Sequence, residues 1–251
     1  MRRIGGLLLT VTFLLAVAAC GGEDEPQAEM SEEPERLLTV YAAASLTEVF
    51  PTIDPTGRYN FAASDDLATQ IREGAPADVY AAASSKYPQE LYDEQLVEEP
   101  VTFASNRLVL IVPKDNPARI ETLQDVTRLG TKLVVGAEGV PVGDYTREVL
   151  NELELANALD NIVSNEDDVK GVVGKVSLGE ADAGFVYSTD AAAAGDEVSV
   201  IELPKGSQPP IQYQIAVVAR SKNKEAAQAF VQKVLASAGQ EALEAAGFLL
   251  P

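Results

Sequence analysis

The sequence predicts an α/β fold in which short strands alternate with helices. From residue 37 to the C-terminus, short apolar runs rich in β-branched and aromatic residues recur. Most segments between these runs place their apolar residues at helical spacing. The chain has 46% apolar and 23% charged residues, a composition typical of globular proteins. Together these patterns indicate mostly parallel sheet covered by helices.

The apolar runs predict strands in a definite order along the chain. They span residues 37–41, 59–62, 78–81, 107–112, 132–136, 183–187, 198–203 and 213–219. After the last strand, 223–246 is predicted as one helix, with Ala227, Phe230, Val231 and Val234 on its apolar face. Binding sites in α/β folds lie at the carboxyl ends of strands, so the helix starts that follow strands are the places to search.

Four helix starts follow such runs closely. Ser45-Leu46-Thr47-Glu48 has the pattern of a capping box, and Ser64 is a predicted N-cap with Asp65 and Asp66 in the first turn. The other two starts lie at 139–144 and 166–170. Capping is the ordinary role of such residues. Several helix N-termini at one sheet edge would, however, form an anion site, because their free backbone N–H groups converge.

Charge and composition exclude several classes of function. The chain has 19 Lys and Arg against 39 Asp and Glu, a net charge of −20, which disfavours nucleic acid as a partner. Histidine is absent, which excludes Ser-His-Asp and Cys-His catalysis and every zinc site that contains histidine. The single cysteine, Cys20, excludes an intramolecular disulfide.

The N-terminus reads as a secretory signal followed by an acidic linker. Residues 1–19 begin with Arg2 and Arg3 and continue with an apolar run too short to span a membrane. Val17-Ala18-Ala19-Cys20 resembles the lipobox of bacterial lipoproteins, which implies cleavage before Cys20 and acylation of its sulfur. Residues 20–36 contain seven acidic residues and are expected to form a flexible tether.

Five sequence blocks at matching spacing resemble the molybdate-binding proteins of bacterial ABC transporters, the ModA family. They are YAAASLT (41–47), FAASDDLA (61–68), GAPADV (74–79), VPVG (140–143) and GFVY (184–187). The resemblance implies a type II periplasmic-binding-protein fold, with two α/β lobes joined by a hinge and the ligand between them. Lobe 1 would comprise 37–103 plus 214–251 and lobe 2 would comprise 104–213, with the hinge near 103–106 and 212–214.

The resemblance also implies a set of ligand-binding residues. Ser45 and Ser64 match the two serines that donate hydroxyl and backbone N–H groups, and Val142 and Val169 match positions that donate backbone N–H. Tyr187 matches the tyrosine whose hydroxyl donates to the ligand. All five lie at expected helix starts or at a strand end.

Three departures from the family pattern stand out. Val142 occupies a position where alanine is common, Asp65 and Asp66 follow Ser64 where small hydroxylated residues are frequent, and the first helix is short because Pro51 and Pro55 interrupt it. A carboxylate facing a dianion would oppose binding, so we expect both aspartates to point to solvent.

The function implied is selection rather than catalysis. The protein would be a monomeric solute-binding protein, anchored by lipidated Cys20 at the outer face of the cytoplasmic membrane. It would capture molybdate, and tungstate of nearly the same size, for an ABC permease. No cofactor and no free metal cation are expected. A site made only of donors accepts fully deprotonated dianions, whereas hydrogen phosphate brings an O–H that needs an acceptor.

Two alternatives stay open at this point. The same fold could bind another anion such as sulfate, because one fold supports many ligands. A different class would be a surface-anchored metal-dependent hydrolase using Asp65, Asp66, Asp167 and Asp168 as carboxylate ligands or acid–base groups.

Overall fold

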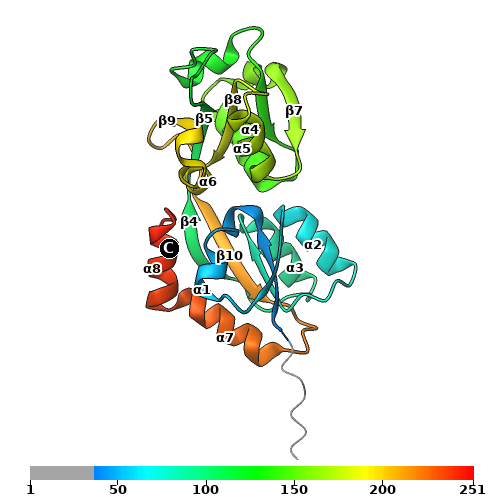
Figure 1. The fold of residues 1–251 in the computed structure, drawn as a ribbon. Coiled ribbons are helices and arrows are strands. Elements are labelled where there is room, and N and C mark those ends of the chain that lie inside the picture. The colour runs from blue at the N-terminus through cyan, green and yellow to red at the C-terminus, as the bar shows by residue number, and fades with distance from the viewer. Residues whose placement is uncertain (1–36) are drawn as a thin grey trace, which may run out of the picture. The chain divides into compact units, whose positions relative to one another are not determined.

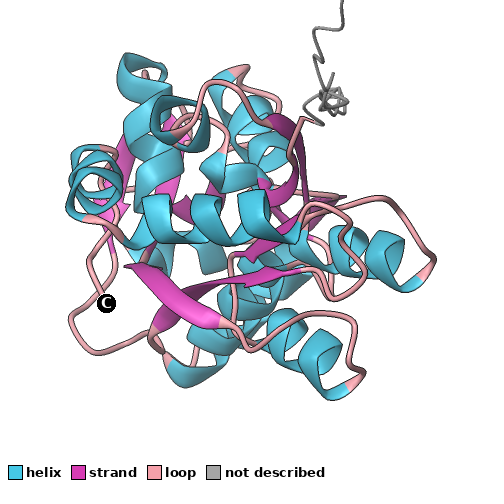
Figure 2. Ribbon diagram, turned by 90° about the horizontal axis from the view of Figure 1, so that it is seen from below, coloured by secondary structure: helices cyan, strands magenta, loops and turns pink. Residues whose placement is uncertain are grey.

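The computed structural model describes residues 37–251. The predicted signal peptide (1–19), the lipidation site Cys20 and the tether (20–36) lie outside the described residues. The described residues belong to one unit by their contacts. They form two five-stranded sheets with helices packed around them (Figure 1, Figure 2). The predicted α/β class is therefore confirmed.

The first sheet has the strand order β2-β1-β3-β10-β4, and we call it, with its helices, the first lobe. Its strands are β1 (Thr39–Ala43), β2 (Arg58–Ala62), β3 (Val79–Ala82), β4 (Val101–Asn106) and β10 (Ile211–Val217). Its helices are the 3-10 turn η1 (Ala44–Leu46), α1 (Phe50–Ile53), α2 (Ser64–Arg72), α3 (Lys86–Asp93), α7 (Lys224–Leu235) and α8 (Ser237–Ala245).

The second sheet has the strand order β7-β6-β8-β5-β9, and we call it, with its helices, the second lobe. Its strands are β5 (Leu108–Pro113), β6 (Leu133–Gly136), β7 (Ile162–Glu166), β8 (Ala183–Tyr187) and β9 (Val198–Glu202). Its helices are η2 (Leu123–Thr127), α4 (Pro141–Glu152), η3 (Ala156–Asn161), α5 (Val169–Ser177), α6 (Ser188–Ala194) and η4 (Gly195–Glu197).

Both sheets are mixed: four strands of each run in one direction, as the expectation of mostly parallel sheet requires, and one strand runs against them. In the first sheet β1 pairs in parallel with β2 and β3, while β10 runs antiparallel to β3 and β4. In the second sheet β6 pairs in parallel with β7 and β8, while β5 runs antiparallel to β8 and β9. The reversed strand is β10 in the first sheet and β5 in the second. Each is the first strand that the chain forms after it crosses from the other lobe.

The chain changes sheets twice. It leaves the first sheet at Asn106 and enters the second at Leu108, and it returns between Glu202 and Ile211. Strand β4, which the sequence patterns do not predict, pairs its end with the start of β10, where Asn106 faces Ile211. The residues expected near the hinge thus lie within paired strands, and the crossings themselves are Arg107 and 203–210.

The C-terminal segment forms two helices where one is expected. Ala236 has an extended conformation, with φ −72° and ψ 160°, and separates α7 from α8. The helices approach so closely that a Cβ on Gly239 would lie 2.1 Å from the carbonyl oxygen of Lys233. The apolar face was predicted correctly, since Ala227, Phe230, Val231 and Val234 are all buried.

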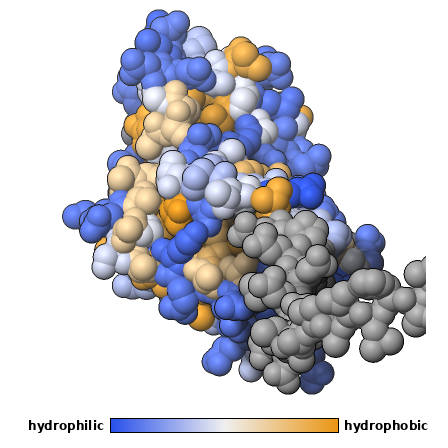
Figure 3. Space-filling model, turned by 60° about the horizontal axis from the view of Figure 1, so that its bottom comes forward, coloured by the Kyte–Doolittle hydropathy of each residue, from blue (hydrophilic) through white to orange (hydrophobic). Residues whose placement is uncertain are grey.

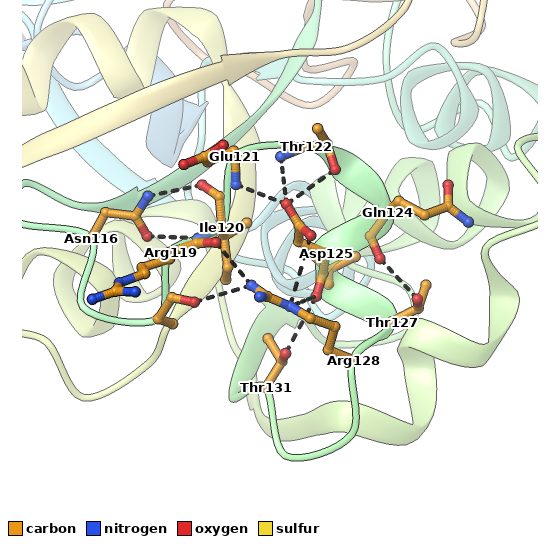
Figure 4. Close-up of polar contacts among 12 residues, drawn as sticks. Asn116, Arg119, Ile120, Glu121, Thr122, Gln124, Asp125, Thr127, Arg128 and Thr131 are labelled. Carbon is orange, nitrogen blue, oxygen red and sulfur yellow. Dashed lines mark hydrogen bonds and ion pairs between the residues drawn. The ribbon is translucent and has the colours of Figure 1, made fainter.

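The segment between β5 and β6 satisfies its own backbone groups (Figure 4). Asp125 Oδ2 accepts hydrogen bonds from the N–H groups of Glu121 and Thr122, at 2.9 and 2.8 Å. Arg128 Nη2 donates to the carbonyls of Ala118 and Arg119, both at 3.0 Å. These bonds hold the segment in place although it contains little regular structure.

The surface of the described part mixes polar and apolar residues. On the face in Figure 3, hydrophilic residues surround smaller hydrophobic groups. Single exposed apolar side chains such as Leu129 and Leu178 are ordinary at protein surfaces. None of the helices within 37–251 has the length and apolar character needed to cross a bilayer.

Candidate functional site

One cavity brings together all five residues that the sequence analysis selected. Its volume is about 20 Å³. Its wall contains the five predicted residues, Ser45, Ser64, Val142, Val169 and Tyr187. The rest of its lining is Ala43, Ala44, Ala62, Ala63, Ala83, Val140, Pro141 and Asp168. Small alanine side chains leave the backbone accessible, so the wall can offer peptide N–H groups to a ligand.

Three helices begin at this cavity. Ser64 is the first residue of α2, Val142 the second of α4 and Val169 the first of α5. The N-cap residues of α2 and α4, Ala63 and Val140, make no side-chain cap bond. The N–H groups of a first helical turn have no intrahelical partner, so these helices keep donors available at their positive dipole ends.

The expectation that the two serines cap helices is wrong. Ser45 lies within η1, and its Oγ is 2.9 Å from Tyr213 Oη. Ser64 Oγ accepts a hydrogen bond of 3.1 Å from the N–H of Ala83. An N-cap hydroxyl would occupy the first-turn N–H groups. Both serines instead pair with neighbouring strand segments, which leaves those N–H groups unused.

Tyr187 contributes a buried hydroxyl at the end of β8. Its side chain is 2% exposed, and its Oη has no hydrogen-bond partner among the described residues. Burial, with Tyr213 nearby, raises the pKa of Tyr187 well above its usual value. The hydroxyl therefore keeps its proton at neutral pH and is available as a donor.

The charges near the cavity agree only in part with the expectation of solvent-facing aspartates. Asp66 is exposed, as expected. Asp65 is only partly exposed and its Oδ1 lacks a partner within the described chain, so the expectation is wrong for this residue. Burial raises the pKa of Asp65. The reason is its place in the first turn of α2, which directs Oδ2 toward Gly139 of the second lobe.

Contacts between the lobes flank the cavity. Tyr87 Oη donates a hydrogen bond to the carbonyl of Gly139, and Lys86 Nζ lies 3.7 Å from Asp144 Oδ2.

A second set of contacts joins the lobes through Lys170. Its Nζ lies 3.7 Å from Glu48 Oε1 and 3.3 Å from Asp190 Oδ1. Burial raises the pKa of Asp190 to about 6, against the opposing attraction of Lys170. The lobes are therefore held together by direct polar contacts beside the cavity.

The carboxylates considered for a hydrolase do not converge. Asp66 and Asp167 are exposed, and Asp168 Oδ1 accepts from Gly171 N at 2.9 Å as the N-cap of α5. Within residues 37–251, no group of three or more His, Cys, Asp or Glu is arranged to hold a metal ion. The lining offers hydroxyl and peptide donors, and Asp168 is its one charged residue.

Two residues that contact the predicted serines were not predicted from the sequence. Tyr213 contacts Ser45 although 168 residues separate them, a pairing that no local pattern signals. Ala83 orients Ser64, and here a signal exists: Ala81-Ala82-Ala83-Ser84 repeats the Ala42-Ala43-Ala44-Ser45 pattern at the end of the neighbouring strand.

Known proteins are similar to this chain in sequence and in fold. Residues 38–249 match the family model of bacterial extracellular solute-binding proteins. The molybdate-binding protein ModA of Mycobacterium tuberculosis (strain H37Rv) is 34% identical over 256 residues, covering 97% of each chain. ModA of Escherichia coli K12 is 32% identical over 200 residues, covering 73% of this chain and 78% of that protein.

Among solved structures, the periplasmic molybdate-binding protein of Azotobacter vinelandii has a TM-score of 0.75 at 23% identity. The match covers 85% of this chain and 99% of that one. This likeness confirms the two-lobed binding-protein fold that the sequence resemblance implies.

Proposed function

Because this chain belongs to the ModA family of bacterial extracellular solute-binding proteins, we propose that it captures molybdate outside the cytoplasm and delivers it to an ABC permease. The family is one of binding proteins and not of enzymes. The observation that carries the proposal is the convergence of Ser45, Ser64, Val142, Val169 and Tyr187 on one cavity. These residues are proposed to bind the oxyanion through hydroxyl and peptide donors.

The composition of the cavity favours a fully deprotonated anion. Its lining contains no Lys or Arg, so attraction comes from helix N-termini and hydroxyl groups. Molybdate, tungstate and sulfate carry no proton at neutral pH and can accept from every donor. Hydrogen phosphate brings a hydroxyl hydrogen that needs an acceptor, and the one carboxylate of the lining, Asp168, already accepts from Gly171 N–H as the N-cap of α5.

Calorimetric titration of residues 37–251 tests this proposal. We expect one-to-one binding of molybdate and of tungstate, and no heat with phosphate, at pH 7. Ser64→Ala should weaken molybdate binding about 10-fold or more, because a hydrogen bond to a charged group contributes roughly 1.5–3 kcal/mol. Tight binding of sulfate with silence from molybdate would replace the proposed ligand by the alternative one. If molybdate, tungstate, sulfate and phosphate all failed to bind, an oxyanion site of this kind would be rejected.

Membrane attachment is a separate part of the proposal. Cys20 follows an apolar run and two alanines, as in a lipoprotein signal, so we propose that its acylated sulfur holds the protein near the permease. Cys20→Ser should move the protein from the membrane fraction of expressing cells to the soluble extracytoplasmic fraction. Fractionation with an antibody against residues 37–251 measures this, and a variant that stays with the membrane would contradict the anchor.

A further inference from the structure

We propose that Tyr213 is a positioning residue that turns the Ser45 hydroxyl hydrogen into the cavity, and that Asn106 sets the direction in which Tyr213 donates. The inference rests on the proposed function and deepens it. It assigns the rejection of protonated anions partly to residues that line no part of the cavity.

The three side chains form a buried series. Ser45 Oγ lies 2.9 Å from Tyr213 Oη, and Asn106 Nδ2 lies 3.4 Å from the same Tyr213 oxygen. All three residues are at most 5% exposed. The distance between the two hydroxyl oxygens does not by itself determine which one donates, because each can give or accept a hydrogen.

Asn106 removes this ambiguity because its own orientation is determined. Its Oδ1 lies 2.9 Å from the backbone N of Arg107, and a peptide N–H can only donate. Ser188 Oγ donates to the same oxygen at 3.0 Å. The amide nitrogen of Asn106 therefore faces the other way, toward Tyr213 and Thr189 Oγ1.

The orientation of Asn106 then determines which atom donates at the Asn106–Tyr213 contact and at the Tyr213–Ser45 contact. Tyr213 Oη accepts from Asn106, and burial raises its pKa well above the usual value, so it keeps its hydrogen. Ser45 Oγ is the acceptor within reach of that hydrogen in the described structure. A buried hydroxyl hydrogen left without an acceptor destabilises the folded state, so Tyr213 donates to Ser45. Ser45 is left with its own hydrogen free, and Ser45 lines the cavity.

Ser64 reaches the same state by another route. The N–H of Ala83 donates to its Oγ, which again leaves the serine hydrogen free. A backbone donor cannot be removed by a side-chain substitution, whereas the tyrosine hydroxyl can. Without that hydroxyl, Ser45 can rotate and present a lone pair, which is the acceptor that a protonated anion needs.

Tyr213→Phe is a suitable variant because it keeps the ring. The ring packs edge-on against Phe103, Tyr187 and Phe248, with centroid separations of 6.1, 5.8 and 5.3 Å. Tyr59→Phe is the matched control, since Tyr59 Oη donates to the carbonyls of Asp54 and Phe50 and lies outside the cavity lining.

The experiment is a double-mutant cycle read by titration with molybdate and with phosphate. Tyr213→Phe should weaken molybdate binding about 2- to 10-fold, the value of one ordinary hydrogen bond. It should also lower the ratio of the affinity for molybdate to the affinity for hydrogen phosphate. In a Ser45→Ala background the same substitution should change molybdate affinity less than 2-fold, about the scatter of independent sites. Tyr59→Phe should leave both anions unaffected.

Each result has a definite meaning. Wild-type affinity and selectivity in Tyr213→Phe would overturn the positioning role while the proposed function stands. If Tyr213→Phe weakened molybdate binding equally in the wild-type and Ser45→Ala backgrounds, the positioning role would also be overturned. Tyr213 would then affect binding through contacts other than its hydrogen bond to Ser45. Failure of the wild-type protein to bind molybdate would reject the proposed function, and the positioning role with it.

Discussion

Replacing Gly143 by alanine should destabilise the protein by about 3 kcal/mol or more and abolish anion binding. A Cβ at this position would lie 2.3 Å from the carbonyl oxygens of both Gly136 and Ala137, and backbone atoms cannot move aside as a flexible side chain can. Gly136 is constrained less severely, because its own Cβ would lie 2.9 Å from Gly143 N. The two glycines let the start of α4 rest on the end of β6, which carries Val142 to the cavity.

Urea unfolding and molybdate titration measure the two parts of this prediction. Gly174→Ala is the matched control, since Gly174 lies inside α5 and a Cβ there would meet nothing within 4 Å. Alanine in an open helical position should stabilise the protein by about 0.5–1 kcal/mol and leave binding intact. Similar midpoints for the two variants would show that α4 does not need this close approach.

Tyr187→Phe should weaken molybdate binding about 10- to 150-fold without loss of stability. The hydroxyl is proposed to donate to a charged oxyanion, and a bond of this kind contributes roughly 1.5–3 kcal/mol. The same hydroxyl has no partner in the described chain, so its removal costs the folded protein no hydrogen bond. The ring keeps its edge-on contact with Tyr213, at a centroid distance of 5.8 Å.

The opposite pattern is expected of Tyr59→Phe. Tyr59 Oη donates to the carbonyl of Asp54 at 2.6 Å, so the variant should lose about 1 kcal/mol of stability while its affinity for molybdate stays unchanged. Thermal unfolding and titration of both variants decide the matter. Unchanged affinity in Tyr187→Phe would remove this tyrosine from the binding site, and a large loss of stability would mean that its hydroxyl has a structural partner.

Much of the fold could be predicted because it depends on local patterns. The apolar runs ending near Ala43, Ala62 and Tyr187 identify β1, β2 and β8, since strand formation reflects the alternation and type of residues in a short window. Strand β4 escaped prediction because its sequence, VTFASN, owes its strand state to pairing with the distant β10. Strand direction escaped for the same reason, as no local pattern encodes it.

The candidate site could likewise be predicted only in part. Sequence blocks selected Ser45, Ser64, Val142, Val169 and Tyr187, and the structure brings all five to one cavity. The hydrogen-bond partners of the serines were predicted wrongly, because capping rules consider only neighbours along the chain. Asp65 was placed wrongly because the second lobe, at Gly139, faces the start of α2.

The sequence by itself determined most of the strand and helix pattern, the absence of histidine chemistry and the five predicted residues that meet at the cavity. Only the tertiary structure decided the mixed strand directions, the partial burial of Asp65 and the contact between Ser45 and Tyr213, which are 168 residues apart. The physical reason is the distance along the sequence over which each effect acts. Propensity and periodicity act over a few residues, whereas the direction of a hydroxyl hydrogen depends on which distant groups the folded chain brings within about 3 Å.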